Sequence, residues 1–151
     1  GEDTASSSWK DVELVDVNSG ESFTVNSLID KPVLLETFAV WCPICTKQQQ
    51  KIAELHEDPE IGDAFVSVTL NIDPNEDEEL VLEHATDNGF DWRYAVAPTS
   101  MTQELVDIYG VTIANAPQAP VVVICPNGQS KLLKGGVKDV SELKEGLEFC
   151  S

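Results

Sequence analysis

Residues 33–45 read VLLETFAVWCPIC, and this stretch decides the class of fold. Its first eight residues are apolar apart from Glu36 and Thr37, which is typical of a central strand covered on both faces. Cys42 and Cys45 follow directly, and beyond them apolar residues recur at helical spacing. The stretch therefore predicts a buried strand, a short turn, and a helix that begins at the cysteines.

Strands and helices are expected to alternate along the rest of the chain. Asp73, Ser100 and Asp139 each precede a helical pattern and have Glu or Gln three residues later, which is typical of a capping box. Helices are expected at about residues 44–55, 73–87, 100–110 and from 139 onward. Strands are expected at about residues 65–70, 92–96, 120–125 and 130–133, with a hairpin within residues 12–25. This order predicts an α/β sheet flanked by helices, with residues 1–11 as a flexible leader and residues 12–151 as one domain.

Composition excludes several classes of function. The chain has 151 residues, and its 27 acidic and 9 basic residues give a formal net charge of −18. Such a chain is repelled by nucleic acid phosphates and by anionic membrane surfaces, so neither is expected as a partner. No apolar run approaches the length of a membrane span. The acidity has a second explanation, a source that grows in high salt, and the sequence leaves this open.

Cys42 and Cys45 form a C-x-x-C pair at the junction of strand and helix. Unpaired backbone N–H groups and the positive end of the helix dipole favour a thiolate at the first position. A thiolate attacks a disulfide to form a mixed disulfide, which a second cysteine one turn later can resolve. We therefore expect Cys42 to be the nucleophile and Cys45 the resolving cysteine. The alternatives are a zinc site, for which no second ligand pair is present, and a purely structural bridge.

The residues around this pair resemble the active site of the thioredoxin-like superfamily. The W-C-x-x-C motif follows a buried strand, and Pro120 precedes a second apolar strand and the turn Asn127-Gly128. The N-terminal hairpin and an extra helix and strand between residues 70 and 100 resemble the redoxin branch, which includes TlpA-like proteins. The resemblance covers residues 12–149. It implies a thioredoxin-like fold, with a central mixed sheet flanked by helices.

The resemblance also implies roles for single residues. Glu36 matches a buried acid that exchanges a proton with Cys45; the alternative is an exposed residue at a strand edge. Pro120 matches the cis-proline whose neighbouring backbone pairs with substrate, with Pro117 as a competing candidate. Trp41, Pro43 and Ala119 complete the expected substrate-binding set. Ala119 departs from the usual Thr, Val or Ile, and Gln48 stands where cytochrome c-maturation proteins often carry Glu.

The topology implied by the family brings Cys125 and Cys150 to the same end of the domain. We expect a structural disulfide between them, with two unpaired thiols as the alternative. Such a bridge indicates an oxidising compartment. His56 and His84 are expected on helix surfaces without a catalytic role.

We therefore expect a protein disulfide oxidoreductase that works as a reductase. Two alternatives stay open: a redox-inactive module that binds metal or a client protein, and a disulfide-forming oxidase. No cofactor or metal site is expected, so electrons must come from a partner redox protein. We expect an extracytoplasmic monomer, with anchoring through a removed N-terminal segment and a cytoplasmic location both left open.

Overall fold

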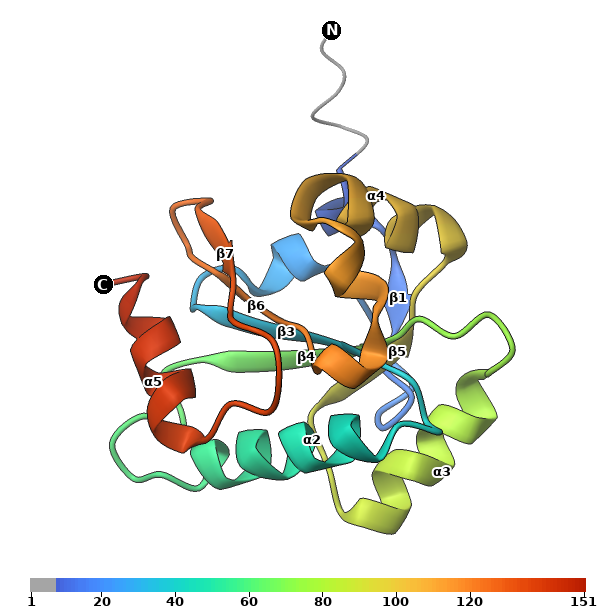
Figure 1. Ribbon diagram of the computed structural model, residues 1–151, viewed down its shortest axis with the longest axis horizontal. Coiled ribbons are helices and arrows are strands. Elements are labelled where there is room, and N and C mark those ends of the chain that lie inside the picture. Colours follow the sequence, from blue (N-terminus) through green and yellow to red (C-terminus); the bar gives the residue numbers. More distant parts are fainter. Residues whose placement is uncertain (1–7) are drawn as a thin grey trace, which may run out of the picture.

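The computed structural model describes residues 8–151, and a five-stranded mixed sheet lies at its centre (Figure 1). In spatial order the strands are β5 (Arg93–Val96), β4 (Val66–Asn71), β3 (Val33–Phe38), β6 (Val121–Ile124) and β7 (Ser130–Leu132). β3, β4 and β5 are parallel, whereas β6 is antiparallel to β3 and β7 is antiparallel to β6. Every residue of β3 is buried, which confirms the predicted central strand.

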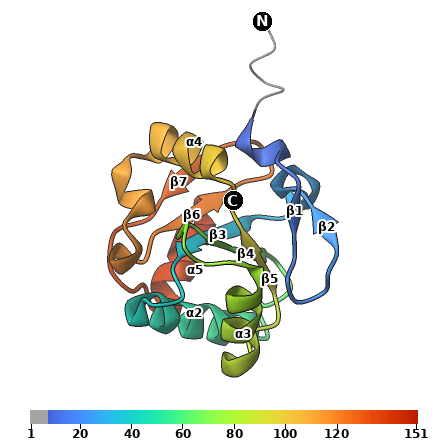
Figure 2. The same ribbon diagram turned by 90° about the vertical axis from the view of Figure 1, so that its right-hand side faces the viewer.

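Helices cover both faces of the sheet (Figures 1 and 2). One face carries α2 (Pro43–His56), α3 (Glu78–Asn88) and α5 (Val140–Glu148). The other carries α4 (Thr99–Tyr109) with the 3₁₀ turns η1 (Trp9–Asp11) and η2 (Val25–Leu28). Two further turns, η3 (Val111–Ala114) and η4 (Ala116–Gln118), lead from α4 into β6. Side chains of β3 alternate between these faces: Leu35 packs in the α4 cluster and Leu34 in the cluster of α2 and α5.

The predicted N-terminal hairpin is present but short. β1 (Leu14–Val15) pairs with β2 (Ser22–Phe23), and the chain just beyond β1 joins the edge of the main sheet through Val17, whose N–H donates to the Tyr94 carbonyl at 2.8 Å. The buried carboxylate of Asp16 accepts from Ser19 Oγ at 2.8 Å and from the backbone N–H of Tyr94 at 3.2 Å. Polar side chains therefore hold the hairpin against β5.

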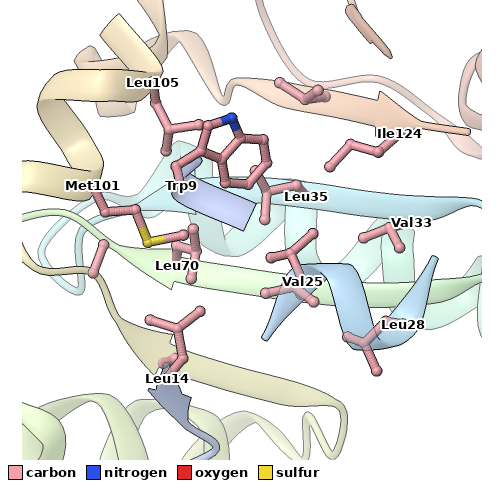
Figure 3. Packing of buried hydrophobic residues seen from close by; sticks show 14 of the residues in the cluster. Trp9, Leu14, Val25, Leu28, Val33, Leu35, Leu70, Met101, Leu105 and Ile124 are labelled. Carbon is pink, nitrogen blue, oxygen red and sulfur yellow. The ribbon is translucent and has the colours of Figure 1, made fainter. Parts of the chain in front are cut away.

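The predicted leader extends too far into the domain. Residues 1–7 lie outside the described residues, but Trp9 is only 2% exposed and packs in the same cluster as Leu105 of α4 (Figure 3). Ser8 caps the turn that begins there by accepting from the N–H of Lys10. Burial of this indole ring removes a large apolar area from water and fixes the turn against the core, so residues 9–11 pack as part of the domain.

Two of the three predicted helix starts are displaced. The capping box of α5 at Asp139 is confirmed. α3 begins after Asp77 instead of Asp73, because Asp73 accepts from the N–H of Asn75 within a separate turn. α4 begins one residue early, after Pro98, whose carbonyl accepts the first helical N–H groups without a side-chain cap.

A disulfide joins Cys125, just after β6, to Cys150, just after α5. This is the expected pairing, at a Cα–Cα distance of 5.1 Å. The register pairs Val33, the first residue of β3, with Ile124, so the disulfide lies near the start of β3. Cys42 follows the other end of that strand, so the bridge is remote from the C-x-x-C pair.

Cys150→Ser is expected to lower the free energy of unfolding by about 3 kcal/mol, because the bridge closes a loop with a sequence separation of 25 residues. Urea unfolding of the variant and of the parent measures the loss. A reductant that opens the Cys125–Cys150 bridge should lower the stability of the parent to about that of the variant. Equal stability of the two proteins would contradict the prediction.

Candidate functional site

Cys42 is the N-cap residue of α2, with extended backbone at φ −94° and ψ 105°. Its Sγ accepts from the backbone N–H of Cys45 at 3.1 Å, and Pro43 occupies the first helical turn, where no intrahelical donor is needed. The sulfur therefore sits where a helix N-terminus stabilises an anion. The sequence predicted this position from the strand, the turn and the cysteine spacing alone.

Cys45 lies one turn further along α2 and is fully buried. Its thiol donates to the carbonyl of Ala116 at 3.2 Å, and both cysteines are unpaired thiols. Burial raises the pKa of Cys45 above its ordinary value, and its contact with Cys42 and the charge of Glu36 act in the same direction. Cys45 therefore keeps its proton at neutral pH and needs a base before it can act as a nucleophile.

Glu36 lies on β3 and shares with Leu34 and Phe38 the face of the strand that α2 covers. Its side chain is fully buried, which raises its pKa well above the ordinary value, although a hydrogen bond from Gln49 and the charge of Lys138 oppose this. Gln49 Nε2 donates to Oε2 at 3.4 Å, whereas no group among the described residues donates to Oε1. Because β3 has neighbours on both sides, the alternative of an exposed strand edge is excluded.

A buried polar network orients Gln49, and sequence analysis missed it. Tyr94 OH donates to Gln49 Oε1 at 2.7 Å, and His84 Nε2 lies 2.7 Å from the same oxygen. An amide oxygen only accepts, so both groups present hydrogens to it and the amide nitrogen is left to face Glu36. The expectation that His84 lies on the surface is wrong: it packs against Phe38, because α3 turns this side chain toward the sheet.

His56 is not on an open helix surface either. It is partly buried, its Nε2 lies 2.8 Å from Ser67 Oγ, and its ring stacks on Phe65 at a centroid distance of 4.4 Å. This packing serves the far end of α2 from the cysteines.

The loop after β4 is hydrogen-bonded to the residues that precede Cys42. Glu76 Oε1 accepts from the backbone N–H of Val40 at 2.8 Å and from Asn71 Nδ2 at 2.7 Å. Asp73 Oδ2 accepts from Trp41 Nε1 at 2.8 Å. Asp73 and Glu76 were expected to start a helix; instead they fix the backbone and the indole ring that precede Cys42.

A groove of about 410 Å³ lies beside the cysteine loop. Trp41, which is 58% exposed, lines this groove together with Ala116 and Pro117. Pro43 is exposed next to Cys42. Of the four expected substrate-binding residues, Trp41 lines the groove and Pro43 is exposed beside Cys42, which leaves Ala119 and Pro120.

Ala119 and Pro120 are both buried and do not line this groove. The expected cis-proline is also wrong, because the described residues contain no cis peptide bond. Instead Ala119 adopts a left-handed conformation at φ 50°, and Ala116 of η4 contacts Cys45 through its carbonyl. It is therefore Pro117 of η4, the competing candidate for the cis-proline position, that lines the groove.

The described residues include no group of three or more His, Cys, Asp or Glu side chains placed to hold a metal ion. Within residues 8–151, no helix has the length and apolar character needed to cross a membrane.

Comparisons with known proteins agree with this geometry. A model of the Redoxin family matches residues 4–145. A search of curated proteins gives no significant match.

Among solved structures, a protein of Aquifex aeolicus VF5 proposed to act in electron transport is similar at 26% identity and a TM-score of 0.73, over 93% of this chain and 94% of that one. A secreted disulfide oxidoreductase of Mycobacterium tuberculosis, homologous to DsbE of E. coli, is 17% identical at a TM-score of 0.67, over 93% and 97% of the two chains. A thiol:disulfide interchange protein of Chlorobium tepidum TLS is 20% identical at a TM-score of 0.70, over 92% of both chains. The last two are likenesses of fold.

Proposed function

Because this chain belongs to the Redoxin family, we propose that it is a thiol–disulfide oxidoreductase that reduces protein disulfides through Cys42 and Cys45. Its fold is thioredoxin-like, with the N-terminal hairpin and the extra α3–β5 unit that the sequence predicted. The observation that carries the proposal is the pair of thiols at the start of α2, with a buried carboxyl group on the strand behind them.

The exchange proceeds in two steps. The Cys42 thiolate attacks one sulfur of a substrate disulfide, which forms a mixed disulfide and releases the other substrate sulfur as a thiolate that takes up a proton. Cys45 then loses its proton and attacks Cys42 Sγ, which releases the second substrate thiol and leaves a Cys42–Cys45 disulfide. Two electrons and two protons pass to the substrate, and a dithiol partner protein returns them.

Glu36 is the base we assign to the second step. A carboxylate whose pKa is raised by burial is a better acceptor for a thiol proton than an ordinary carboxylate. Within residues 8–151 no group donates to its Oε1, which can therefore take a proton. Transfer from Cys45 to Glu36 produces the second nucleophile within the closed site.

We propose reduction of the substrate disulfide as the direction of electron flow, with a disulfide-forming oxidase as the alternative. The reduced site holds Cys42 and Cys45 as unpaired thiols that can donate two electrons.

Equilibration with glutathione tests the direction. We expect the protein to catalyse insulin reduction by dithiothreitol, and the Cys42–Cys45 pair to stay oxidised until the glutathione buffer is almost fully reduced. A pair that becomes a dithiol in a mostly oxidised buffer would mark an oxidase. Failure both to reduce insulin and to equilibrate would overturn the proposed function in favour of a binding module.

The Cys125–Cys150 disulfide supports an extracytoplasmic location, since such bridges persist in oxidising compartments. The secreted mycobacterial protein of similar fold agrees with this. We propose protein disulfides as substrates there and a redox protein as electron donor, with the domain acting as a monomer.

A further inference from the structure

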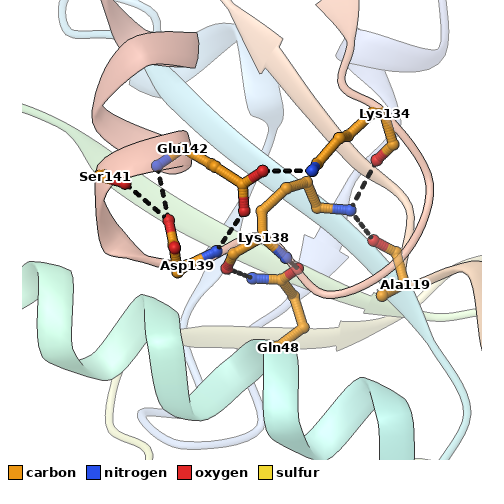
Figure 4. A network of polar contacts seen from close by, with 7 residues as sticks. All are labelled: Gln48, Ala119, Lys134, Lys138, Asp139, Ser141 and Glu142. Atoms are coloured by element: carbon orange, nitrogen blue, oxygen red, sulfur yellow. Dashed lines mark hydrogen bonds and ion pairs between the residues drawn. The ribbon is translucent and has the colours of Figure 1, made fainter.

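A buried lysine lies behind the dithiol site, and sequence analysis did not single it out. Lys138 is 1% exposed and comes just before α5. Its Nζ donates to the carbonyl of Ala119 at 2.6 Å and to the carbonyl of Lys134 at 3.0 Å (Figure 4). Burial of an ammonium group destabilises the folded state unless the charge is paired or hydrogen-bonded.

The backbone of this lysine is fixed to the helix that carries the cysteines. Gln48 lies one turn after Cys45, and its Nε2 donates to the carbonyl of Lys138 at 3.0 Å while its Oε1 accepts from the Lys138 N–H at 2.8 Å. Figure 4 shows Gln48 of α2 and the Ala119 segment on either side of Lys138. The lysine therefore links α2 to the chain that enters β6.

The ammonium group also stands close to Glu36 along the sheet. Glu36 pairs with Val121 across β3 and β6, and the carbonyl of Pro120 accepts from the N–H of Thr37. Nζ of Lys138 therefore binds a carbonyl only two residues from the cross-strand partner of Glu36.

The two charges act on each other. The charge of Lys138 lowers the pKa of Glu36 against the larger effect of burial. Burial lowers the pKa of Lys138 to about 8, while the charges of Glu36 and Glu142 raise it and that of Lys134 lowers it. Glu142 is paired with Lys134, which leaves Glu36 as the buried acid that Lys138 faces.

We propose that Lys138 is a positioning residue of the exchange reaction: it holds the Ala119 segment in place and supplies a fixed positive charge for a single negative charge that moves between Cys45 and Glu36. This inference rests on the proposed function. Before the second step the negative charge is on the Glu36 carboxylate and Cys45 is a thiol. After proton transfer Glu36 is neutral and Cys45 is a thiolate, so the buried site carries no net charge in either state.

Lys138→Met removes this charge and keeps an unbranched apolar side chain. Glu36 then holds its proton to higher pH and cannot accept one from Cys45. We expect the rate at which Cys45 resolves a Cys42 mixed disulfide to fall about tenfold at pH 7, and the midpoint of its pH profile to move up by about one unit. Stopped-flow mixing with a glutathione adduct of Cys42 measures this rate from pH 5 to pH 9.

Lys134→Met is the matched control. It removes the same charge from the same loop, but the Lys134 side chain is 65% exposed, so the pH profile should stay that of the parent. In a Glu36→Gln background, Lys138→Met should move the pH profile less than in the parent, because only the Cys45 thiolate is then left for the charge of Lys138 to stabilise.

Two results overturn the inference while leaving the proposed function intact: a parent-like pH profile in Lys138→Met, or the same loss of rate with and without Glu36. If the parent protein does not reduce insulin, the proposed function itself is overturned. Should Lys138→Met not fold, nuclear magnetic resonance of the Lys138 side chain decides. Its titration midpoint should fall in Glu36→Gln, and an unchanged midpoint overturns the inference.

Discussion

Cys45→Ser is expected to lower turnover with a protein disulfide by at least about a thousandfold while leaving Cys42 able to attack. The second step is intramolecular in the parent, and losing a well-placed internal nucleophile removes an effective concentration far above that of any external thiol. Serine keeps a donor for the Ala116 carbonyl, which Cys45 Sγ contacts at 3.2 Å, so the site should stay folded. A stable mixed disulfide with substrate should therefore accumulate, and mass spectrometry measures it.

Cys42→Ser is the control for this result. It removes the nucleophile, so both turnover and the trapped adduct should disappear. If Cys42→Ser retained the adduct and Cys45→Ser lost it, the two roles would be exchanged. A protein that binds clients without turnover would be indifferent to both changes.

Trp9→Ala is expected to lower the free energy of unfolding by about 3–5 kcal/mol, the range for a buried Trp or Phe cut back to Ala. Trp9 is 2% exposed and fills the space between α4 and β3, in one cluster with Leu35 and Leu105 (Figure 3). The surrounding side chains come from several elements, so they cannot close over the cavity. Urea unfolding, followed by circular dichroism, measures the loss.

Trp41→Ala is the matched control, because it removes the same side chain from a site that is 58% exposed. Its loss of stability should stay below about 1 kcal/mol. Equal losses of stability in the two variants would mean that Trp9 is not part of the core. The domain would then begin at residue 12, as expected from the sequence.

The cysteine site could be predicted because its determinants are local. The apolar run through Phe38 and the cysteine spacing place Cys42 at a helix start, and alternation along one strand turns Glu36 toward that helix. The disulfide followed from topology, once the family's strand order was assumed. These features depend on neighbouring residues or on one well-defined fold.

The supporting groups could not be predicted, because each depends on contacts between distant segments. Gln49 lies at helical spacing from Cys45, which is a weak signal, but Tyr94 reaches it from a separation of 45 residues. Gln48 and Lys138 meet across 90 residues. The expected cis bond at Pro120 was wrong. The residue before it, Ala119, is left-handed, and its carbonyl accepts from the ammonium of Lys138, a contact between separate segments that no local pattern predicts.

The unequal exposure of the tryptophans gives the protein a natural optical reporter. Trp9 is enclosed in the core, and Trp92 is partly buried with its Nε1 donating to Thr69 Oγ1, whereas the Trp41 indole faces solvent one residue before Cys42. A soluble quencher therefore acts mainly on Trp41. A partner that covers this ring changes the emission next to the nucleophile, so its arrival can be followed in real time without a label.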